Sequence, residues 1–307
     1  MKSSFVPEGV YGAMITPFAS NGKIDEEVVE RLVDFYICKG IDGVFAVSNV
    51  GEFPCLTADE RKRLIDQSCS KGCGKLKVCS GVSDINFDVT IKLAEHSARR
   101  GADAVVISAP SIYKYRPEYV ESFIRTFLEQ TPLPVIFYNS PMYANPVSFD
   151  FLIEIMAHPN VIALKDSSGD AILLQKLIAR CEDEQIDTPV LIGFEDLCLT
   201  GLVHGAKGSM TSSGGIVPEL MIELTKSFKE GNINRAIDIQ KSVSRIASLL
   251  ASYGLPHGYK LGMVARGFSF NIIQSPKLFD YENYLKGQVD IIRELIVGEF
   301  SRLKIKY

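Results

Sequence analysis

Short apolar runs alternate with amphipathic stretches through residues 1–216 of this 307-residue chain. In the amphipathic stretches, apolar positions three and four residues apart predict helices that turn one side toward a core. Each helix closes at a glycine or at basic residues, and a short, mostly apolar run follows, as expected of a buried strand. The predicted strands cover residues 10–15, 41–47, 78–80, 104–107, 134–138, 161–164, 189–192 and 207–210.

This alternation predicts an α/β fold, a (β/α)8 TIM barrel, since the number of strands reaches eight. A doubly wound sheet is the competing fold, but it more often has five or six strands and a glycine-rich first turn, which Thr16-Pro17-Phe18 is not. After about Ile216 the strand pattern stops. Helices are expected there at 218–229, 232–252, 255–267 and 281–297. We therefore predict a barrel over 1–216 and C-terminal helices over 217–307 that pack on it, because no linker separates them.

The composition is that of a globular protein, with 46% hydrophobic residues, 23% charged residues and a formal net charge of −4. It favours neither a nucleic-acid partner, which needs a basic surface, nor a membrane span of about 20 apolar residues. The first residues lack an apolar signal core, which predicts a cytoplasmic protein. Seven cysteines occur without CxxC spacing, and Cys69, Cys73 and Cys79 have no neighbouring histidine. Scattered reduced thiols are expected, with no metal ion and no cofactor.

A lysine ends the sixth predicted strand. Lys165 follows Val161-Ile162-Ala163-Leu164 and precedes a polar turn that contains glycine. Burial disfavours the charged ammonium and so lowers the pKa of a lysine, and a neutral amine can attack a carbonyl to form a Schiff base. On this segment alone the simpler interpretation is a lysine that caps the strand and extends to solvent. The residues at the other strand ends have to decide between the two.

Barrel enzymes carry their chemistry on the loops that follow the strands. Tyr138 ends the fifth predicted strand, adjacent to the strand of Lys165, and a phenol there can move a proton while the amine forms and breaks a carbinolamine. Glu195 and Asp196 follow the seventh strand, where they either accept hydroxyl hydrogens of a polyol or favour a helix N-terminus electrostatically. The other candidates at strand ends are Ser48, Asn49 and Val50 after the second strand, Tyr113 and Tyr115 after the fourth, and Met210 in the eighth.

Five motifs in the chain resemble the dihydrodipicolinate synthase/N-acetylneuraminate lyase family of class I aldolases. They occur in family order along nearly the whole chain and are Thr16-Pro17-Phe18, Gly51-Glu52, Tyr138-Asn139-x-Pro141, Lys165-Asp166-x-x-Gly169-Asp170 and Gly254-x-Pro256-x-x-x-Lys260. The resemblance implies that Lys165 forms a Schiff base with pyruvate or another 2-oxo acid and that Tyr138 relays the proton. It also implies a homotetramer built from dimers, in which a neighbouring subunit supplies a second tyrosine. Tyr113 is the candidate for that tyrosine, and Tyr115 is the alternative.

The loop before Gly51-Glu52 departs from the family pattern. Family members usually have two small hydroxyl or amide residues there, whereas an ungapped register places Asn49 and Val50 at those positions. An amide cannot relay a proton as a hydroxyl does, although backbone N–H groups of the loop could still bind a carboxylate. A slip of one residue would place Ser48 and Asn49 there instead. A barrel that binds a 2-oxo acid for regulation, without turnover, is therefore the alternative from another functional class.

The substrate is indicated by a missing arginine. Dihydrodipicolinate synthases carry an arginine shortly after the strand-five tyrosine to hold a second carboxylate, and residues 141–146 contain none. Segments 52–57 and 165–170 resemble branches that act on 4-hydroxy-2-oxoglutarate and 2-keto-3-deoxy sugar acids. We therefore predict a metal-independent lyase that cleaves such an acid. A dehydratase and a dihydrodipicolinate synthase-type condensation on the same intermediate are the alternatives.

Overall fold

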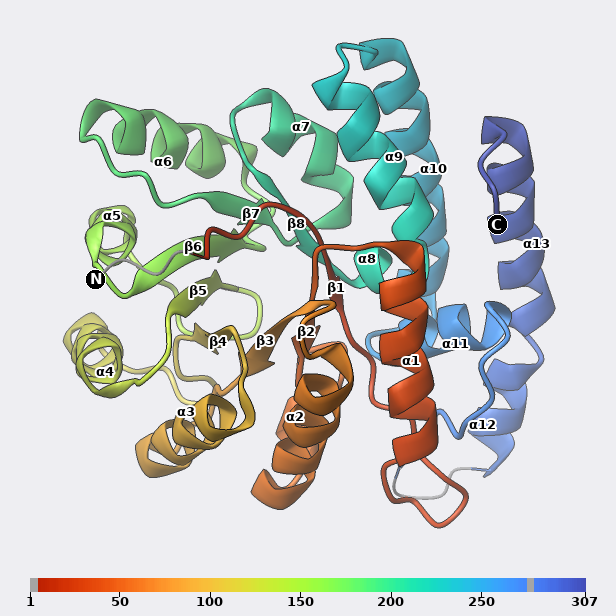
Figure 1. The fold of residues 1–307 in the computed structure, drawn as a ribbon, viewed down its shortest axis with the longest axis horizontal. Coiled ribbons are helices and arrows are strands. Elements are labelled where there is room, and N and C mark those ends of the chain that lie inside the picture. The colour runs from red at the N-terminus through yellow and green to blue at the C-terminus, as the bar shows by residue number, and fades with distance from the viewer. Residues whose placement is uncertain (1–4, 275–278) are drawn as a thin grey trace.

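A computed structural model describes residues 5–274 and 279–307. Parallel strands follow one another around a closed barrel, which β8 completes by pairing with β1 (Figure 1). The strands are β1 (Gly9–Ala13), β2 (Gly43–Ala46), β3 (Lys77–Gly81), β4 (Ala104–Ser108), β5 (Val135–Asn139), β6 (Val161–Asp166), β7 (Val190–Ile192) and β8 (Gly208–Thr211). The predicted (β/α)8 barrel is confirmed.

Helices surround the barrel, and their ends follow the local sequence signals. Helix α2 begins with a capping box, in which the Glu60 N–H donates to the Thr57 hydroxyl and the Thr57 N–H donates to the Glu60 carboxylate. Helices α1 and α3 end at Gly40 and Gly101, whose left-handed backbone (φ 74° and 80°) suits glycine. The elements are α1 (Glu26–Lys39), η1 (Phe53–Cys55), α2 (Ala58–Gly72), α3 (Phe87–Arg100), α4 (Pro117–Gln130), α5 (Phe149–Ala157), α6 (Ala171–Asp183), η2 (Glu195–Leu197), α7 (Cys198–Val203) and α8 (Ser212–Ile216).

The C-terminal region is helical, as predicted, with α9 (Pro218–Lys229), α10 (Ile233–Ser252), α11 (His257–Ala265), α12 (Phe279–Lys286) and α13 (Val289–Leu303). The prediction of one helix over 281–297 was wrong, because the helix is interrupted between α12 and α13. Gly287 lies at this break, and glycine weakens a helix interior although the apolar spacing continues through it. Helix α11 also begins two residues later than predicted, after the cis peptide Leu255–Pro256.

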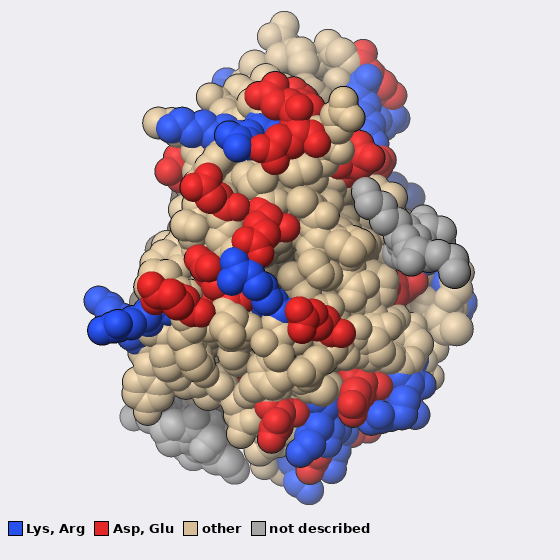
Figure 2. Space-filling model, turned by 90° about the vertical axis from the view of Figure 1, so that its left-hand side faces the viewer, with Lys and Arg blue, Asp and Glu red and all other residues tan. Residues whose placement is uncertain are grey.

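The C-terminal helices pack directly on the barrel. Helix α9 contacts β1, α10 contacts η2, and α11 contacts α8, so that one apolar core extends from the strands into this region. The division of the chain into two units at Ile216 stays a prediction. On the face that includes α4, α5 and α6, acidic and basic side chains are interspersed (Figure 2). None of the helices in the described ranges is long and apolar enough to cross a membrane.

Candidate active site

The amine of Lys165 lies inside the mouth of the barrel, at the carboxyl end of β6. The residue is only 4% exposed, and its Nζ lies 3.9 Å from the ring centroid of Tyr138 and 4.7 Å from that of Phe45. Burial lowers the pKa of Lys165 below the usual lysine value, against the opposing effects of Tyr138 and Glu195. At a given pH, a larger fraction of this amine is therefore neutral and nucleophilic than in a solvated lysine.

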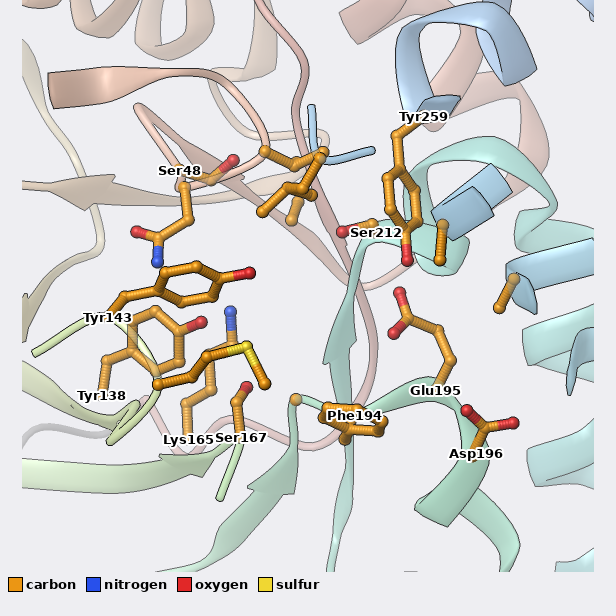
Figure 3. Close-up of a pocket in the computed structure, with 18 of the residues that line it drawn as sticks. Ser48, Tyr138, Tyr143, Lys165, Ser167, Phe194, Glu195, Asp196, Ser212 and Tyr259 are labelled. Carbon is orange, nitrogen blue, oxygen red and sulfur yellow. The ribbon is translucent and has the colours of Figure 1, made fainter. Parts of the chain in front are cut away.

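Tyr138 stands beside Lys165 because of the strand register. The two residues are partners in the parallel pairing of β5 with β6, so their side chains emerge at the same level of the barrel. The Tyr138 ring packs edge-on against Phe45 at 6.2 Å, which fixes its position. Its hydroxyl and the Lys165 amine both lie in the cavity shown in Figure 3. A phenol and an amine can thus reach the same small ligand.

The ends of β5 and β6 are tied together just beyond these two residues. The Asn139 amide donates a hydrogen bond of 2.7 Å to the Asp166 carboxylate, and the Ser168 hydroxyl donates another of 2.8 Å. Burial raises the pKa of Asp166, whereas these two hydrogen bonds favour its charged form. The network fixes the backbone from which Tyr138 and Lys165 project.

A cavity of about 370 Å³ opens at this end of the barrel. The predicted site residues that line it are Ser48, Asn49, Val50, Tyr138, Lys165, Glu195 and Asp196. Met210 does not line it, because this residue is fully buried in the hydrophobic core. Ser212, the first residue of α8 just after the same strand, lines the cavity instead. Tyr113 is 64% exposed on the surface and is not among the lining residues, so its predicted place in a neighbouring subunit's site stays a prediction.

Several lining residues were not predicted. Tyr143 follows Tyr138 by five residues and Ser167 follows Lys165 by two, so both belong to strand-end loops that the sequence had already pointed to. Tyr259 comes from α11 in the C-terminal region, and only the packing of that helix brings it to the cavity. The hydroxyls of Tyr143, Ser167 and Tyr259 add hydrogen-bonding groups to the wall of the cavity (Figure 3).

Glu195 provides a buried carboxylate on the opposite side of the cavity from Tyr138 (Figure 3). Its Oε1 accepts a hydrogen bond of 3.1 Å from the backbone N–H of Ser213, and the residue is 8% exposed. Burial raises the pKa of Glu195, and the positive charge of Lys165 opposes that shift. Tyr259 points its hydroxyl toward this carboxylate, and its own pKa is raised first by burial and then by Glu195 (Figure 3). This side of the cavity presents acceptors suited to hydroxyl hydrogens.

The cysteines, and the side chains that could bind a metal ion, are dispersed in the described residues. All seven cysteines are free, with Cys69 and Cys79 buried and Cys73 exposed. Burial raises the pKa of Cys79, which makes that thiol unreactive. No group of three or more His, Cys, Asp or Glu side chains in residues 5–274 and 279–307 is placed to hold a metal ion.

The sequence matches the model of the dihydrodipicolinate synthetase family over residues 6–292. The chain belongs to this family. An uncharacterised DapA-like lyase of Pyrococcus horikoshii is 32% identical over 93% of this chain and 99% of its own length. An N-acetylneuraminate lyase of Rhizobium meliloti is 28% identical over 82% of this chain and 83% of its own.

A solved relative supports the fold of this dihydrodipicolinate synthetase family protein. The crystal structure of a prophage protein of the dihydrodipicolinic acid synthase family from Escherichia coli, in complex with pyruvate, superposes with a TM-score of 0.84. It is 23% identical and covers 95% of this chain and 99% of that one. The family match and the two lyases found by sequence show that the chain is an aldolase/lyase of the family.

Proposed function

We propose that this lyase forms a Schiff base between Lys165 and the carbonyl of a 2-oxo acid, and that it cleaves a 2-keto-3-deoxy sugar acid to pyruvate and an aldehyde. The observation that carries the proposal is the buried amine of Lys165 beside the phenol of Tyr138 at the cavity. Loop residues Asn49 and Val50 line the cavity as well, and their backbone N–H groups are suited to the carboxylate of the acid.

The proposed reaction uses side chains of this chain alone. The Lys165 amine attacks C2 of the substrate, and the carbinolamine loses water with a proton supplied by Tyr138. Tyr138 then takes the proton of the C4 hydroxyl while the C3–C4 bond breaks. The electron pair of that bond moves toward the iminium and gives an enamine. The aldehyde leaves, C3 is protonated, and water releases pyruvate and the free amine. Because the iminium accepts the electron pair, these steps need no metal ion.

The charges around the cavity favour a neutral, hydroxylated tail on the substrate. Lys165 is the only basic side chain among the described residues that line the cavity, so a second carboxylate or a phosphate would have no cation to pair with. The carboxylates of Glu195 and Asp196 are instead acceptors for hydroxyl hydrogens. These features favour a sugar acid over 4-hydroxy-2-oxoglutarate, which carries a second carboxylate. N-acetylneuraminate, after which the Rhizobium relative is named, is itself a 2-keto-3-deoxy sugar acid.

Glu195→Gln tests the substrate class. With a panel of 2-keto-3-deoxy acids assayed for pyruvate release, we expect KM for the best sugar acid to rise about 10- to 100-fold, as expected for loss of a charged hydrogen bond. Formation of the pyruvate adduct should stay unchanged, since Glu195 contacts the tail in this proposal. Glu182→Gln, an exposed residue of α6, is the matched control. Better turnover of a dicarboxylate or a phosphorylated acid would refute the assignment.

Gly193→Ala tests whether the position of Lys165 matters. A Cβ at Gly193 would lie 2.0 Å from the Ser167 hydroxyl oxygen and 2.9 Å from Cε of Lys165, so both side chains have to shift. We expect adduct formation with pyruvate to slow on the order of 100-fold, the effect of a misplacement of about 1 Å. Gly298→Ala in α13, where a Cβ meets no atom within 4 Å, is the control and should react normally. An unchanged rate in Gly193→Ala would contradict the assigned geometry.

Two alternatives rest on specific features. Asn49 and Val50 motivate a regulatory barrel that binds a 2-oxo acid without turnover; it predicts pyruvate binding by calorimetry and no pyruvate release from any acid in the panel. A dehydratase would use the same Lys165 intermediate and release water instead of an aldehyde, which product analysis distinguishes. The paired Lys165 and Tyr138 favour the lyase.

The homotetramer and the cytoplasmic location stay predictions. Tyr113 and Ile112 are 64% and 81% exposed, and Tyr113 packs edge-on against Tyr115 at 6.1 Å. Tyr115 in turn stacks on Tyr119 at 4.4 Å, which leaves Tyr113 outermost in this aromatic cluster. This exposure supports Tyr113 over Tyr115 as the residue that enters a neighbouring subunit.

A further inference from the structure

The loop of residues 47–52 has an unfavourable backbone at both ends. Val47 and Glu52 each have φ of 59°, in the left-handed region that residues with a side chain rarely adopt, and least of all a β-branched one. Such conformations persist only where the surrounding structure holds them, and they cluster at functional sites. Between the two lie Ser48, Asn49 and Val50, which line the cavity. The contacts that hold this loop therefore affect where these three residues lie in the cavity.

The middle of the loop offers free donors. The N–H groups of Gly51 and Glu52 donate to the carbonyls of Ser48 and Asn49, each at 3.0 Å. Within the described part of the chain, the N–H groups of Asn49 and Val50 have no acceptor. Two neighbouring free N–H groups on a curved loop suit an anion, which here is the carboxylate of the proposed 2-oxo acid.

The barrel holds the beginning and the middle of the loop. The Ser48 hydroxyl donates to the carbonyl of Met14 at 2.8 Å, and the Thr16 hydroxyl donates to the carbonyl of Gly51 at 2.6 Å. Neither bond reaches the side chain of Glu52, where the loop leaves the cavity. A different contact holds that end.

The carboxylate of Glu52 forms an ion pair with the ammonium of Lys260, which comes from α11. Lys260 is fully buried, donates a hydrogen bond of 2.9 Å to the carbonyl of Ile272 and lies over the ring of Phe18 at 4.1 Å. Burial lowers the pKa of Lys260 to about 8, and Glu52 opposes this shift. A fully buried ammonium is unfavourable unless a partner compensates it, so Glu52 and Lys260 constrain each other.

Neither residue of the pair lines the cavity at Lys165, although Glu52 lines an adjacent hollow that Asn49 also borders. We propose that Glu52 and Lys260 are positioning residues, whose buried ion pair holds the end of loop 47–52 and thereby sets the N–H groups of Asn49 and Val50 relative to Lys165. The C-terminal region thus fixes the carboxylate-binding part of the site. This inference rests on the proposed Schiff-base function.

A comparison of two carbonyl compounds tests the inference. Pyruvate has a carboxylate and hydroxyacetone has none. For each compound, borohydride trapping measures the concentration that gives half of the maximal adduct at Lys165. In Lys260→Met and in Glu52→Gln we expect the value for pyruvate to rise at least about tenfold, as for a misplaced binding group, while the value for hydroxyacetone stays the same. If the pair only stabilised the fold, the ratio of the half-saturating concentrations of pyruvate and hydroxyacetone would not change.

Glu219→Gln is the matched control, since Glu219 forms a similarly buried ion pair with Arg266 away from the cavity. It should lower Tm and leave the ratio unchanged. If Lys260→Met does not fold, Glu52→Gln and the double variant, which leaves no unpaired buried charge, decide in its place. If the ratio stays at the wild-type value in the folded variants, the inference is overturned and the proposed function still stands. Absence of an adduct in the wild type overturns the proposed function and the inference with it.

Discussion

Lys165→Ala is expected to abolish the stable adduct that borohydride forms between this protein and pyruvate, and to abolish pyruvate release from any 2-keto-3-deoxy acid. The proposed Schiff base joins the substrate to Nζ, so without that atom neither imine formation nor C3–C4 cleavage can occur. Intact-protein mass spectrometry of the reduced sample measures the adduct, and peptide mapping locates it. Lys176→Ala, an exposed lysine on α6, should keep both adduct and activity.

The pH dependence of trapping provides an independent check on the same lysine. Burial lowers the pKa of Lys165 below its ordinary value of 10.5. Since only the neutral amine attacks, the trapping rate should rise with pH and reach its midpoint below 10.5. An adduct that survives in Lys165→Ala would exclude Lys165 as the nucleophile, whereas a midpoint at or above the ordinary value would contradict the lowered pKa.

Tyr138→Phe is expected to lower kcat about 10²- to 10⁴-fold, the range of a lost general acid–base group. The ring should keep its edge-on contact with Phe45, so the barrel mouth and the binding of the 2-oxo acid are expected to change little. Single-turnover kinetics with the best acid of the panel separates the chemical step from binding. Tyr284→Phe, an exposed residue of α12, controls for the loss of a hydroxyl elsewhere.

An unchanged kcat in Tyr138→Phe would assign the proton transfer to another group. Tyr143 is the next candidate, because its hydroxyl lies in the same cavity (Figure 3). Tyr143→Phe and the double variant would then identify the relay. Retention of full activity in both single variants and in the double variant would remove tyrosine from the proposed mechanism.

The barrel could be predicted from the sequence because its signals are local. Apolar runs such as Val161 to Leu164, together with helix ends at Gly40 and Gly101, depend on periodicity and backbone preference alone. The helix over 281–297 failed for the same reason, since its apolar periodicity continues past the break at Gly287. Periodicity reports which face is buried and does not report where a helix stops.

The site could be predicted only in part. Lys165 and Tyr138 were found because a barrel places all strand ends at one mouth, so that position in the chain implies position in space. The prediction for Met210 was wrong by two residues, since Met210 is buried in the core and Ser212 lines the cavity. Tyr259 was missed although it lies inside the motif Gly254-x-Pro256-x-x-x-Lys260, because the motif does not say how α11 packs against the barrel mouth.

The C-terminal helices α10 and α11 supply part of the cavity wall, through Ala247, Ala251 and Tyr259. The residues of the proposed imine chemistry, Tyr138 and Lys165, lie on β5 and β6, whereas this part of the wall comes from helices outside the barrel. Point mutations on two helices can therefore reshape the space for the substrate tail without disturbing the strands that carry the amine and the phenol. Such separation gives evolution, or a directed-evolution library, a route to new substrates while the residues on β5 and β6 stay unchanged.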